Sequence, residues 1–424
     1  MAPLGPFEPA PRLAVAASGG ADSTALALLA FGWAADRGGS VLALVVDHGL
    51  RPESAAEAAL TCGRLAQRGI PARRLTLHDV ARGPGLAARA RTARYAALER
   101  ACAEAGIVHL LLAHHAADQA ETVALRMLDH SGPAGLAGMA MLSESRHVRR
   151  LRPLLPVPPG RLRATLRAGA MEWVEDPSNQ DPSAMRARLR ALRADPAGTG
   201  AGTRSALVDS IARGEQRQAC ERADAAELAA RVTVYPAGYA ILTPGRIAPS
   251  AFSALLRMVA GRRYPPSLSQ VEPLAAALRP ATVGGVRIMR APGRLAPGAW
   301  VLAREAAAMA LPLPACPGAI WDGRFHLCGD VSLPDGATLG ALGADAAGLR
   351  RRSPLPAAVL HTLPALRIDG NLFAVPHLGY AKNHSGRLPA LVFDPPAPAA
   401  GAPFVPAPGQ MLLNWPKDRA GNRG

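Results

Sequence analysis

Ser18-Gly19-Gly20-Ala21-Asp22-Ser23 decides the fold of this chain, because of what stands on either side of it. The apolar run 13–17 precedes it and predicts a buried strand, and the helix-forming run 24–30 follows. Adjacent glycines let backbone N–H groups approach an anion closely, and a helix N-terminus adds unpaired donors. By itself the stretch also fits a serine-capped helix after a glycine turn. It is not a Walker A loop, since no Gly-Lys-Ser/Thr follows.

The alternation of strand and helix continues to about residue 130. Apolar runs at 41–46 and 107–112 predict buried strands, and 72–77 predicts a weaker one. Helices are expected between them at 52–67, 86–105 and 117–128. The rhythm predicts an α/β fold with a doubly wound parallel sheet. Ligands of such sheets bind beyond the carboxyl ends of the strands, which is where the polar motifs of this chain fall.

The rest of the chain divides by composition. We expect a catalytic domain over 1–195, a mostly helical domain over 204–280 and a small mixed α+β domain over 281–394. Residues 395–424 are rich in proline, alanine and glycine and are expected to form a disordered tail.

Charge points to a polyanionic partner. The formal net charge is +16 and the isoelectric point is about 10.9, with arginine supplying nearly all of the positive side chains. Arginine makes forked contacts to phosphate, so nucleic acid is favoured over a membrane surface. A general arginine bias of the genome is the alternative. Aromatic content of only 4% argues against binding by extensive base stacking.

The five cysteines are scattered, and no two form a C-x-x-C pair. This usage predicts reduced thiols in the cytoplasm rather than a disulfide framework or a zinc site. No signal peptide and no apolar run long enough to span a membrane is expected.

Three further motifs carry chemistry. His48 ends a buried strand beside a glycine, where it can meet a nucleotide. Arg91 and Arg94 share one helix face and can neutralise phosphate or guide a carboxylate, although a solvated face has the same pattern. Asp118 and Glu121 stand one turn apart at a helix start, where they can hold magnesium or an ammonium group or simply complement the helix dipole.

Taken together, the motifs resemble those of the tRNA(Ile)-lysidine synthases, which belong to the PP-loop ATP pyrophosphatases. The resemblance covers about 13–193, and segments at 321–325 and 375–380 are similar to the C-terminal part of proteobacterial members. The matching motifs keep the family's order and spacing: Ser18–Ser23, Val46–Arg51, Ala90–Tyr95, His115–Thr122, Ser131–Met139 and Glu175–Arg190. The resemblance implies the adenine nucleotide alpha hydrolase-like fold.

The resemblance also implies an activity. Members use ATP and Mg²⁺ to adenylate the C2 oxygen of the wobble cytidine in tRNA(Ile) with a CAU anticodon, releasing pyrophosphate. The amine of free L-lysine then attacks C2, expels AMP and forms lysidine. The oxygen is a poor leaving group until it carries AMP, and the amine must lose a proton to become nucleophilic.

By the same resemblance, each motif receives a role. The family pattern implies catalytic roles for Asp118, Glu121 and Arg94, metal binding by Asp22 and Asp118, and tRNA contacts by Arg186, Arg188 and Arg190. Residues implied to bind ATP are Ser18, Gly19, Gly20, Ala21, Asp22, Ser23 and His48.

The chemistry that PP-loop enzymes share and three departures from the family pattern each leave one alternative open. Ala117 stands where an acid is usual, Asp129-His130 replaces Arg-Gly, and Ala187 replaces an asparagine. One alternative is a PP-loop enzyme that thiolates tRNA. The other is a tRNA-binding protein with a degenerate catalytic site.

Overall fold

The computed structural model describes residues 1–49, 53–77, 83, 85–175, 185–293, 295–329, 333–382 and 389–410. It divides into two compact units, one formed by 1–219 with 402–424 and the other by 220–401. Parts of two sequence motifs, 50–52 and 176–184, lie outside the described residues. Within the described ranges, no helix is long and apolar enough to cross a membrane.

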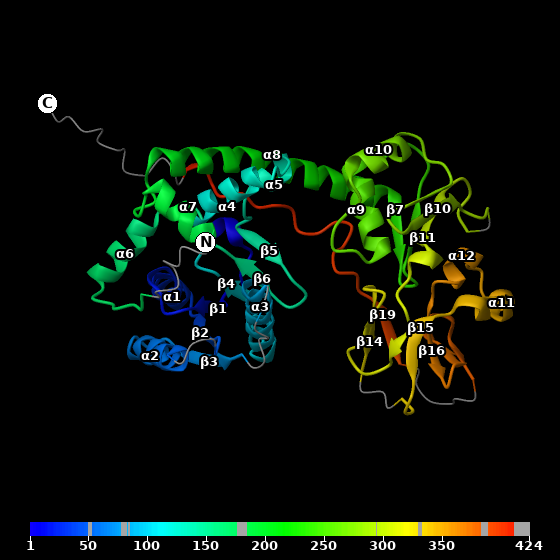
Figure 1. Ribbon diagram of the computed structural model, residues 1–424, viewed down its shortest axis with the longest axis horizontal. Coiled ribbons are helices and arrows are strands. Elements are labelled where there is room, and N and C mark those ends of the chain that lie inside the picture. Colours follow the sequence, from blue (N-terminus) through cyan, green and yellow to red (C-terminus); the bar gives the residue numbers. More distant parts are fainter. Residues whose placement is uncertain are drawn as a thin grey trace. The chain divides into compact units, whose positions relative to one another are not determined.

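The first unit is built on a six-stranded sheet with the order β3-β2-β1-β4-β6-β5 (Figure 1). All neighbouring strands are parallel except β5, which runs antiparallel to β6. The strands are β1 (Arg12–Ala17), β2 (Ser40–Asp47), β3 (Ala72–Thr76), β4 (His109–Leu111), β5 (Leu142–Glu144) and β6 (Arg149–Leu151). The helices are α1 (Ala21–Ala35), α2 (Ser54–Gln67), α3 (Leu86–Glu104), α4 (Ala116–Leu128), α5 (Pro133–Leu136), α6 (Pro159–Ala168), α7 (Met185–Arg193) and the start of α8 (Ala201–Arg231).

Strand order explains where the ligand site must lie. From β1 the chain moves to β2 and β3, then crosses back to place β4 on the other side of β1; Leu13 of β1 pairs with Val41 and with His109. This reversal makes a crevice outside the carboxyl ends of β1 and β4, the usual ligand position in a doubly wound sheet. The predicted fold class is confirmed.

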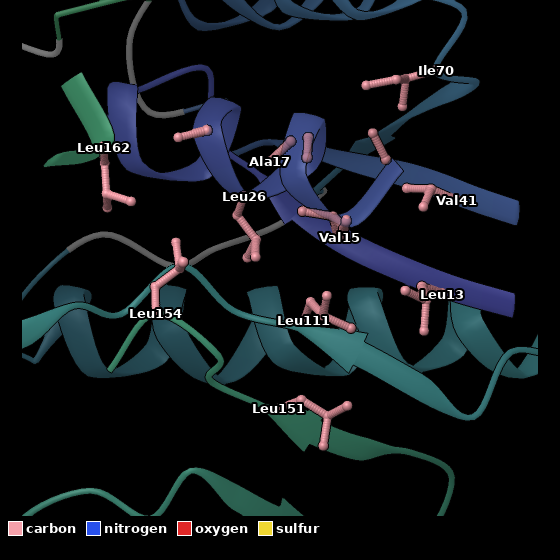
Figure 2. Packing of buried hydrophobic residues seen from close by; sticks show 14 of the residues in the cluster. Leu13, Val15, Ala17, Leu26, Val41, Ile70, Leu111, Leu151, Leu154 and Leu162 are labelled. Atoms are coloured by element: carbon pink, nitrogen blue, oxygen red, sulfur yellow. The ribbon is translucent and has the colours of Figure 1, made fainter. Parts of the chain in front are cut away.

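Alternating side chains of β1 bury both faces of this sheet. Leu13 and Val15 pack in a cluster with Leu26 of α1, as Figure 2 shows. Ala14, on the opposite face, packs with Leu98 of α3. A strand buried on both faces needs helices on both, which is why the apolar run 13–17 is continuous rather than alternating.

Residues 402–410, within the segment expected to be a disordered tail, pack against the first unit. Phe404 and Ala407 are buried in the first unit, and the N–H of Met141 donates to the carbonyl of Val405 at 2.8 Å. Gly214 of α8 lies against Phe404, since a Cβ there would come within 2.9 Å of its ring. Apolar side chains of this proline-rich segment are thus buried although residues 402–409 form no helix or strand.

The second unit is mostly antiparallel sheet. Its strands form three sheets with the orders β7-β8-β11-β10-β9, β12-β15-β16-β17-β18 and β13-β14-β19. The strands are β7 (Val232–Tyr235), β8 (Tyr239–Leu242), β9 (Ala281–Val283), β10 (Val286–Arg290), β11 (Trp300–Arg304), β12 (Leu313–Pro314), β13 (Ile320–Trp321), β14 (Phe325–Cys328), β15 (Thr338–Ala341), β16 (Pro364–Ile368), β17 (Asn371–Val375), β18 (Tyr380–Ala381) and β19 (Ala390–Phe393). The helices are α9 (Pro249–Ala260), α10 (Leu268–Ala276), α11 (Ala346–Leu349) and α12 (Ala357–Leu360).

This unit crosses the boundary that composition suggested at 280/281. β7 and β8, within the segment expected to be mostly helical, share a sheet with β9–β11. One face of that sheet packs against α9 and α10, and the other packs against α11, α12 and β16. Residues on both sides of the suggested boundary therefore belong to one hydrophobic core.

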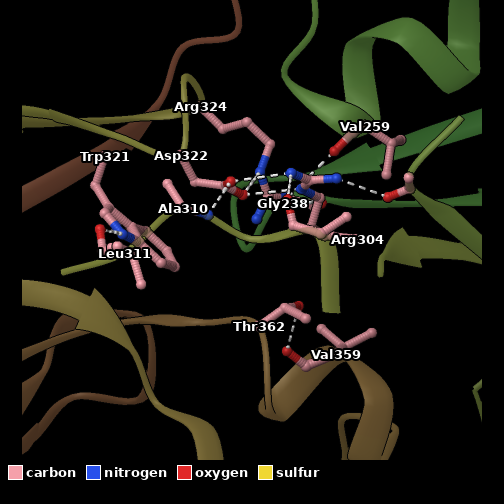
Figure 3. Close-up of polar contacts among 12 residues, drawn as sticks. Gly238, Val259, Arg304, Ala310, Leu311, Trp321, Asp322, Arg324, Val359 and Thr362 are labelled. Atoms are coloured by element: carbon pink, nitrogen blue, oxygen red, sulfur yellow. Dashed lines mark hydrogen bonds and ion pairs between the residues drawn. The ribbon is translucent and has the colours of Figure 1, made fainter. Parts of the chain in front are cut away.

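A buried charge cluster joins the sheets of the second unit (Figure 3). Asp322 accepts hydrogen bonds from Arg304 Nε at 3.0 Å and from Arg324 Nε at 2.8 Å. Arg324 is fully buried and also donates to the carbonyls of Gly238 and Val259. The Trp-Asp-Gly-Arg-Phe motif at 321–325 is therefore structural, because its charges pair with each other and with backbone carbonyls of neighbouring elements.

Candidate functional site

Local hydrogen bonds fix the loop between β1 and α1. The N–H of Ser18 donates to Ser23 Oγ at 3.0 Å, and Ser23 Oγ donates to the carbonyl of Gly20 at 3.1 Å. Gly19 has a φ of +84°, and a Cβ there would lie 2.4 Å from Thr61 Oγ1 of α2. Glycine alone meets both requirements. The loop is a closed turn that presents the N-terminus of α1.

A cavity of about 960 Å³ lies beside this loop, at the switch point between β1 and β4. Its walls come from the loop, α3, the end of β4, α4 and α7. Every residue predicted to act in catalysis or to bind ATP or metal lines the cavity except Gly19, whose carbonyl accepts the N–H of Val174 at 2.8 Å. Of the three arginines predicted to contact tRNA, Arg190 lines the cavity, whereas Arg186 and Arg188 do not. The volume lies in the range of about 300–1,000 Å³ typical of cofactor and substrate sites.

His115 begins helix α4 and connects it to the loop. Its N–H donates to Asp118 Oδ2 at 3.1 Å, and the N–H of Asp118 donates back to His115 Nδ1 at 3.4 Å, a reciprocal cap. The other ring nitrogen, Nε2, lies 3.4 Å from Asp22 Oδ2. Burial lowers the pKa of His115, but the hydrogen bond to Asp22 and the charges of Asp118 and Glu121 together raise it.

Asp118 and Glu121 form a buried carboxylate pair, and a cation already binds it. Arg190 of α7 donates through Nε to Glu121 Oε1 at 2.6 Å. Its Nη2 reaches Glu121 Oε2 at 3.3 Å and Asp118 Oδ1 at 3.4 Å. Burial lowers the pKa of Arg190, but the bond to Glu121 and the charges of both carboxylates raise it overall. The pair is therefore a cation-binding site inside the cavity.

Asp22 is the residue best suited to hold a metal ion. Its Oδ1 is buried without a hydrogen-bond partner, whereas Oδ2 faces His115. An orphaned carboxylate oxygen beside a phosphate-binding loop fits Mg²⁺, which binds one or two carboxylates together with phosphate oxygens and water. In the part of the chain that the structure describes, no cluster of three or more His, Cys, Asp or Glu side chains could hold a metal. The protein residues thus supply only part of a coordination shell.

Basic and neutral side chains line the side formed by α3 and the end of β4. Arg94 is paired with no other described residue, and burial lowers its pKa. His48 lies in the same cavity at the end of β2. Burial also lowers the pKa of His114 to about 4, so this imidazole is neutral at pH 7, and its Nδ1 has no partner. The cavity therefore has a cationic wall at Arg94 and an anionic wall at the carboxylate pair.

Sequence reasoning missed two features of this site. It assigned Arg190 to tRNA, whereas the structure pairs Arg190 with a carboxylate 69 residues away. It also gave no role to the backbone around Val174, which closes over the glycine loop. Neither contact leaves a local pattern, although an arginine-rich helix following a buried acidic pair in the sequence is a weak signal for the first.

The departures from the family pattern fall in different places. Ala117 lines the cavity, whereas Asp129 and His130 lie exposed at the end of α4, outside the residues that line it. His130 has a φ of +50°, where a glycine would be unstrained. Arg126 donates to the carbonyl of Gly138 at 2.7 Å and so holds the neighbouring loop. The Asp129-His130 change therefore leaves the walls of the cavity intact.

The first unit contains two cysteines, Cys62 and Cys102, and neither lines the cavity. Cys102 of α3 is buried in the core, and burial raises its pKa to about 12. Burial also raises the pKa of Cys62 in α2. A thiolation enzyme needs a thiolate or a metal cluster at the site, so this geometry does not favour that chemistry.

Known proteins are similar to this chain over much of its length. The PP-loop domain family matches residues 2–193. A tRNA(Ile)-lysidine synthase of Rhodopseudomonas palustris is 40% identical over 64% of this chain and 81% of its own length. Its counterpart from Ruegeria pomeroyi is 35% identical over 90% of this chain and 92% of its own. One from Bradyrhizobium is 45% identical, but the match spans 47% of this chain and 56% of that protein.

Proposed function

The chain belongs to the tRNA(Ile)-lysidine synthase family, and from this premise we propose how its cavity joins free L-lysine to the wobble cytidine of tRNA(Ile) with a CAU anticodon. The observation that carries the proposal is the placement of a phosphate-binding loop and a buried carboxylate pair in one cavity. These are the two chemical functions that the reaction needs: binding of ATP and binding of a cationic amine.

ATP is assigned to the loop Ser18–Ser23 and the N-terminus of α1. Backbone N–H groups and the helix dipole there favour the pyrophosphate, and the Gly19 turn keeps them facing the cavity. Asp22 would hold Mg²⁺ through its unpaired Oδ1, and the ion would neutralise phosphate charge during adenylation of the cytidine oxygen. His48 completes the nucleotide side of the cavity.

Lysine is assigned to the space between the cationic wall at Arg94 and the anionic wall at the Asp118–Glu121 pair. Asp118 and Glu121 bind its ammonium group, and Arg94 attracts its carboxylate because Arg94 has no anionic partner among the described residues. The amine must give up a proton before it attacks C2, and the carboxylate pair that binds it can receive that proton. Asp118 can also contact the metal only if Arg190 leaves its Oδ1.

The tRNA partner follows from charge as well as from family. A chain with a formal charge of +16 binds phosphates strongly, and those contacts position the RNA without reading its sequence. All five cysteines are free thiols, which favours a cytoplasmic location.

Exchange of radiolabel between pyrophosphate and ATP tests the first half-reaction. We expect exchange that depends on tRNA(Ile) with a CAU anticodon and that is lost in Asp22→Asn. A chain that binds this tRNA tightly but supports no exchange is a binding protein with a degenerate site, and the proposal then fails.

A further inference from the structure

The two partners of the ion pair at the carboxylate site differ sharply in burial. The Glu121 side chain is 2% exposed, whereas the Arg190 side chain is 43% exposed. Glu121 lies within α4 with its side chain buried, so moving its carboxylate away would disturb the packing around it. The Arg190 side chain is already partly exposed, so it can turn fully into solvent. The carboxylates are therefore the fixed partner and the guanidinium is the exchangeable one.

Helix α7, which carries Arg190, makes few described contacts with the rest of the first unit. None of its residues is buried, so it contributes no side chain to the hydrophobic core. Besides Arg190, the described tether is Arg193, whose Nη2 donates to Thr203 Oγ1 at 2.7 Å. Among the residues that the structure describes, Arg188 bonds only Met185 Sγ of the same helix, at 3.8 Å. The ion pair of Arg190 is thus a main attachment of α7 to the cavity wall.

Energetics favour exchange of one cation for another over simple addition. An unpaired buried carboxylate is strongly destabilising, so Asp118 and Glu121 favour a bound cation whenever both are ionised. A second cation beside Arg190 would meet like-charge repulsion, and both oxygens of Glu121 are already engaged. An incoming ammonium group therefore binds these carboxylates in place of the guanidinium.

We propose that Arg190 is an internal substitute for the amine substrate. In the free enzyme its guanidinium is bound by Asp118 and Glu121, and lysine displaces it from them. The inference rests on the proposed function, because it assumes that this pair is the lysine site. A tethered guanidinium competes at an effective concentration in the millimolar range or above, so it lowers the apparent affinity for lysine. Displacement also releases α7, so lysine binding and the mobility of this basic helix are coupled.

Lysine binding to the full-length chain, measured by calorimetry without ATP or tRNA, tests the exchange. Arg190→Gln removes the competitor and keeps a side chain of similar length, so it should bind lysine about tenfold more tightly than the unmodified chain. Arg188→Gln, the same change on the same helix, should leave the lysine affinity unchanged. Equal or weaker lysine binding by Arg190→Gln would overturn the inference.

Hydrogen exchange of the unmodified chain gives a second readout that needs no variant. Saturating lysine should speed amide exchange across 185–193, and in Arg190→Gln these amides should exchange fast from the start. Slower exchange of this helix with lysine would show that Arg190 stays and clamps the substrate, which contradicts displacement. Glu121→Gln separates the two proposals: if it binds lysine as well as the unmodified chain, the lysine site itself is wrong; if it loses lysine while Arg190→Gln gains nothing, only the exchange fails.

Discussion

Substituting Gly19 by alanine probes the geometry on which ATP binding depends. At a φ of +84° an L-residue costs about 1–2 kcal/mol. The new Cβ would also lie 2.4 Å from Thr61 Oγ1, and forcing extra volume into a packed site costs roughly 1–3 kcal/mol. The two costs together destabilise the loop of Gly19→Ala by about 3 kcal/mol. Local opening of this region should then be about a hundredfold more frequent than in the unmodified chain.

Hydrogen exchange of the amides of β1 and α1 in the full-length chain measures this opening, and titration with ATP measures the consequence for binding. Adding Thr61→Ala to Gly19→Ala should remove the destabilisation caused by the close contact. The destabilisation caused by the backbone conformation, about 1–2 kcal/mol, should remain. Gly20→Ala is the matched control: its φ is −69° and the nearest atom to a new Cβ is 3.6 Å away, so its exchange should change little. Equal protection of β1 and α1 in Gly19→Ala and Gly20→Ala would refute the reasoning.

Three further predictions concern the buried charges, acid stability and RNA binding. Asp322→Asn leaves Arg304 and Arg324 buried without a counter-ion and should destabilise the second unit by about 3–5 kcal/mol in urea unfolding; a loss below 1 kcal/mol would contradict the buried-pair account. The hydroxyl of Ser54 lowers the pKa of Asp47, so ionised Asp47 stabilises the fold above its unfolded pKa, and this stabilisation is lost as pH falls through the lowered pKa. Ser54→Ala should therefore have a lower free energy of unfolding than the unmodified chain near neutral pH, and the difference between the two proteins should become smaller in acid. Affinity for tRNA should fall steeply with salt in filter binding, whereas a flat response would exclude phosphate contacts as its main source.

Local patterns in the sequence were sufficient to predict the first unit. Continuous apolar runs at 13–17 and 41–46 identify strands buried on both faces, and β1 and β2 occupy them. Gly69 and Gly106, predicted to stop helices, have φ values of +74° and +63° just after α2 and α3. Each of these signals lies within a few residues of the structure that it specifies, so one sequence can reveal it.

Contacts between distant segments could not be predicted in this way. The ion pair of Arg190 joins residues 69 apart, and an arginine-rich helix predicts RNA contact equally well. Strand β6 was hidden because its Arg149 and Arg150 look solvent-facing, yet Arg149 donates to the carbonyls of Leu4 and Gly5. The hairpin β7–β8 did have a signal, in the β-branched and aromatic residues around Gly238, but the helical segments beside it dominated the prediction.

The central claim is that this cavity couples lysine to tRNA through the Asp118–Glu121 pair. Its most direct test is the incorporation of radiolabelled lysine into tRNA(Ile) with a CAU anticodon, in the presence of ATP and Mg²⁺, beside an Asp118→Ala control. The account predicts label that requires ATP and is lost in the control. No incorporation despite tight tRNA binding, or undiminished incorporation by Asp118→Ala, would contradict it.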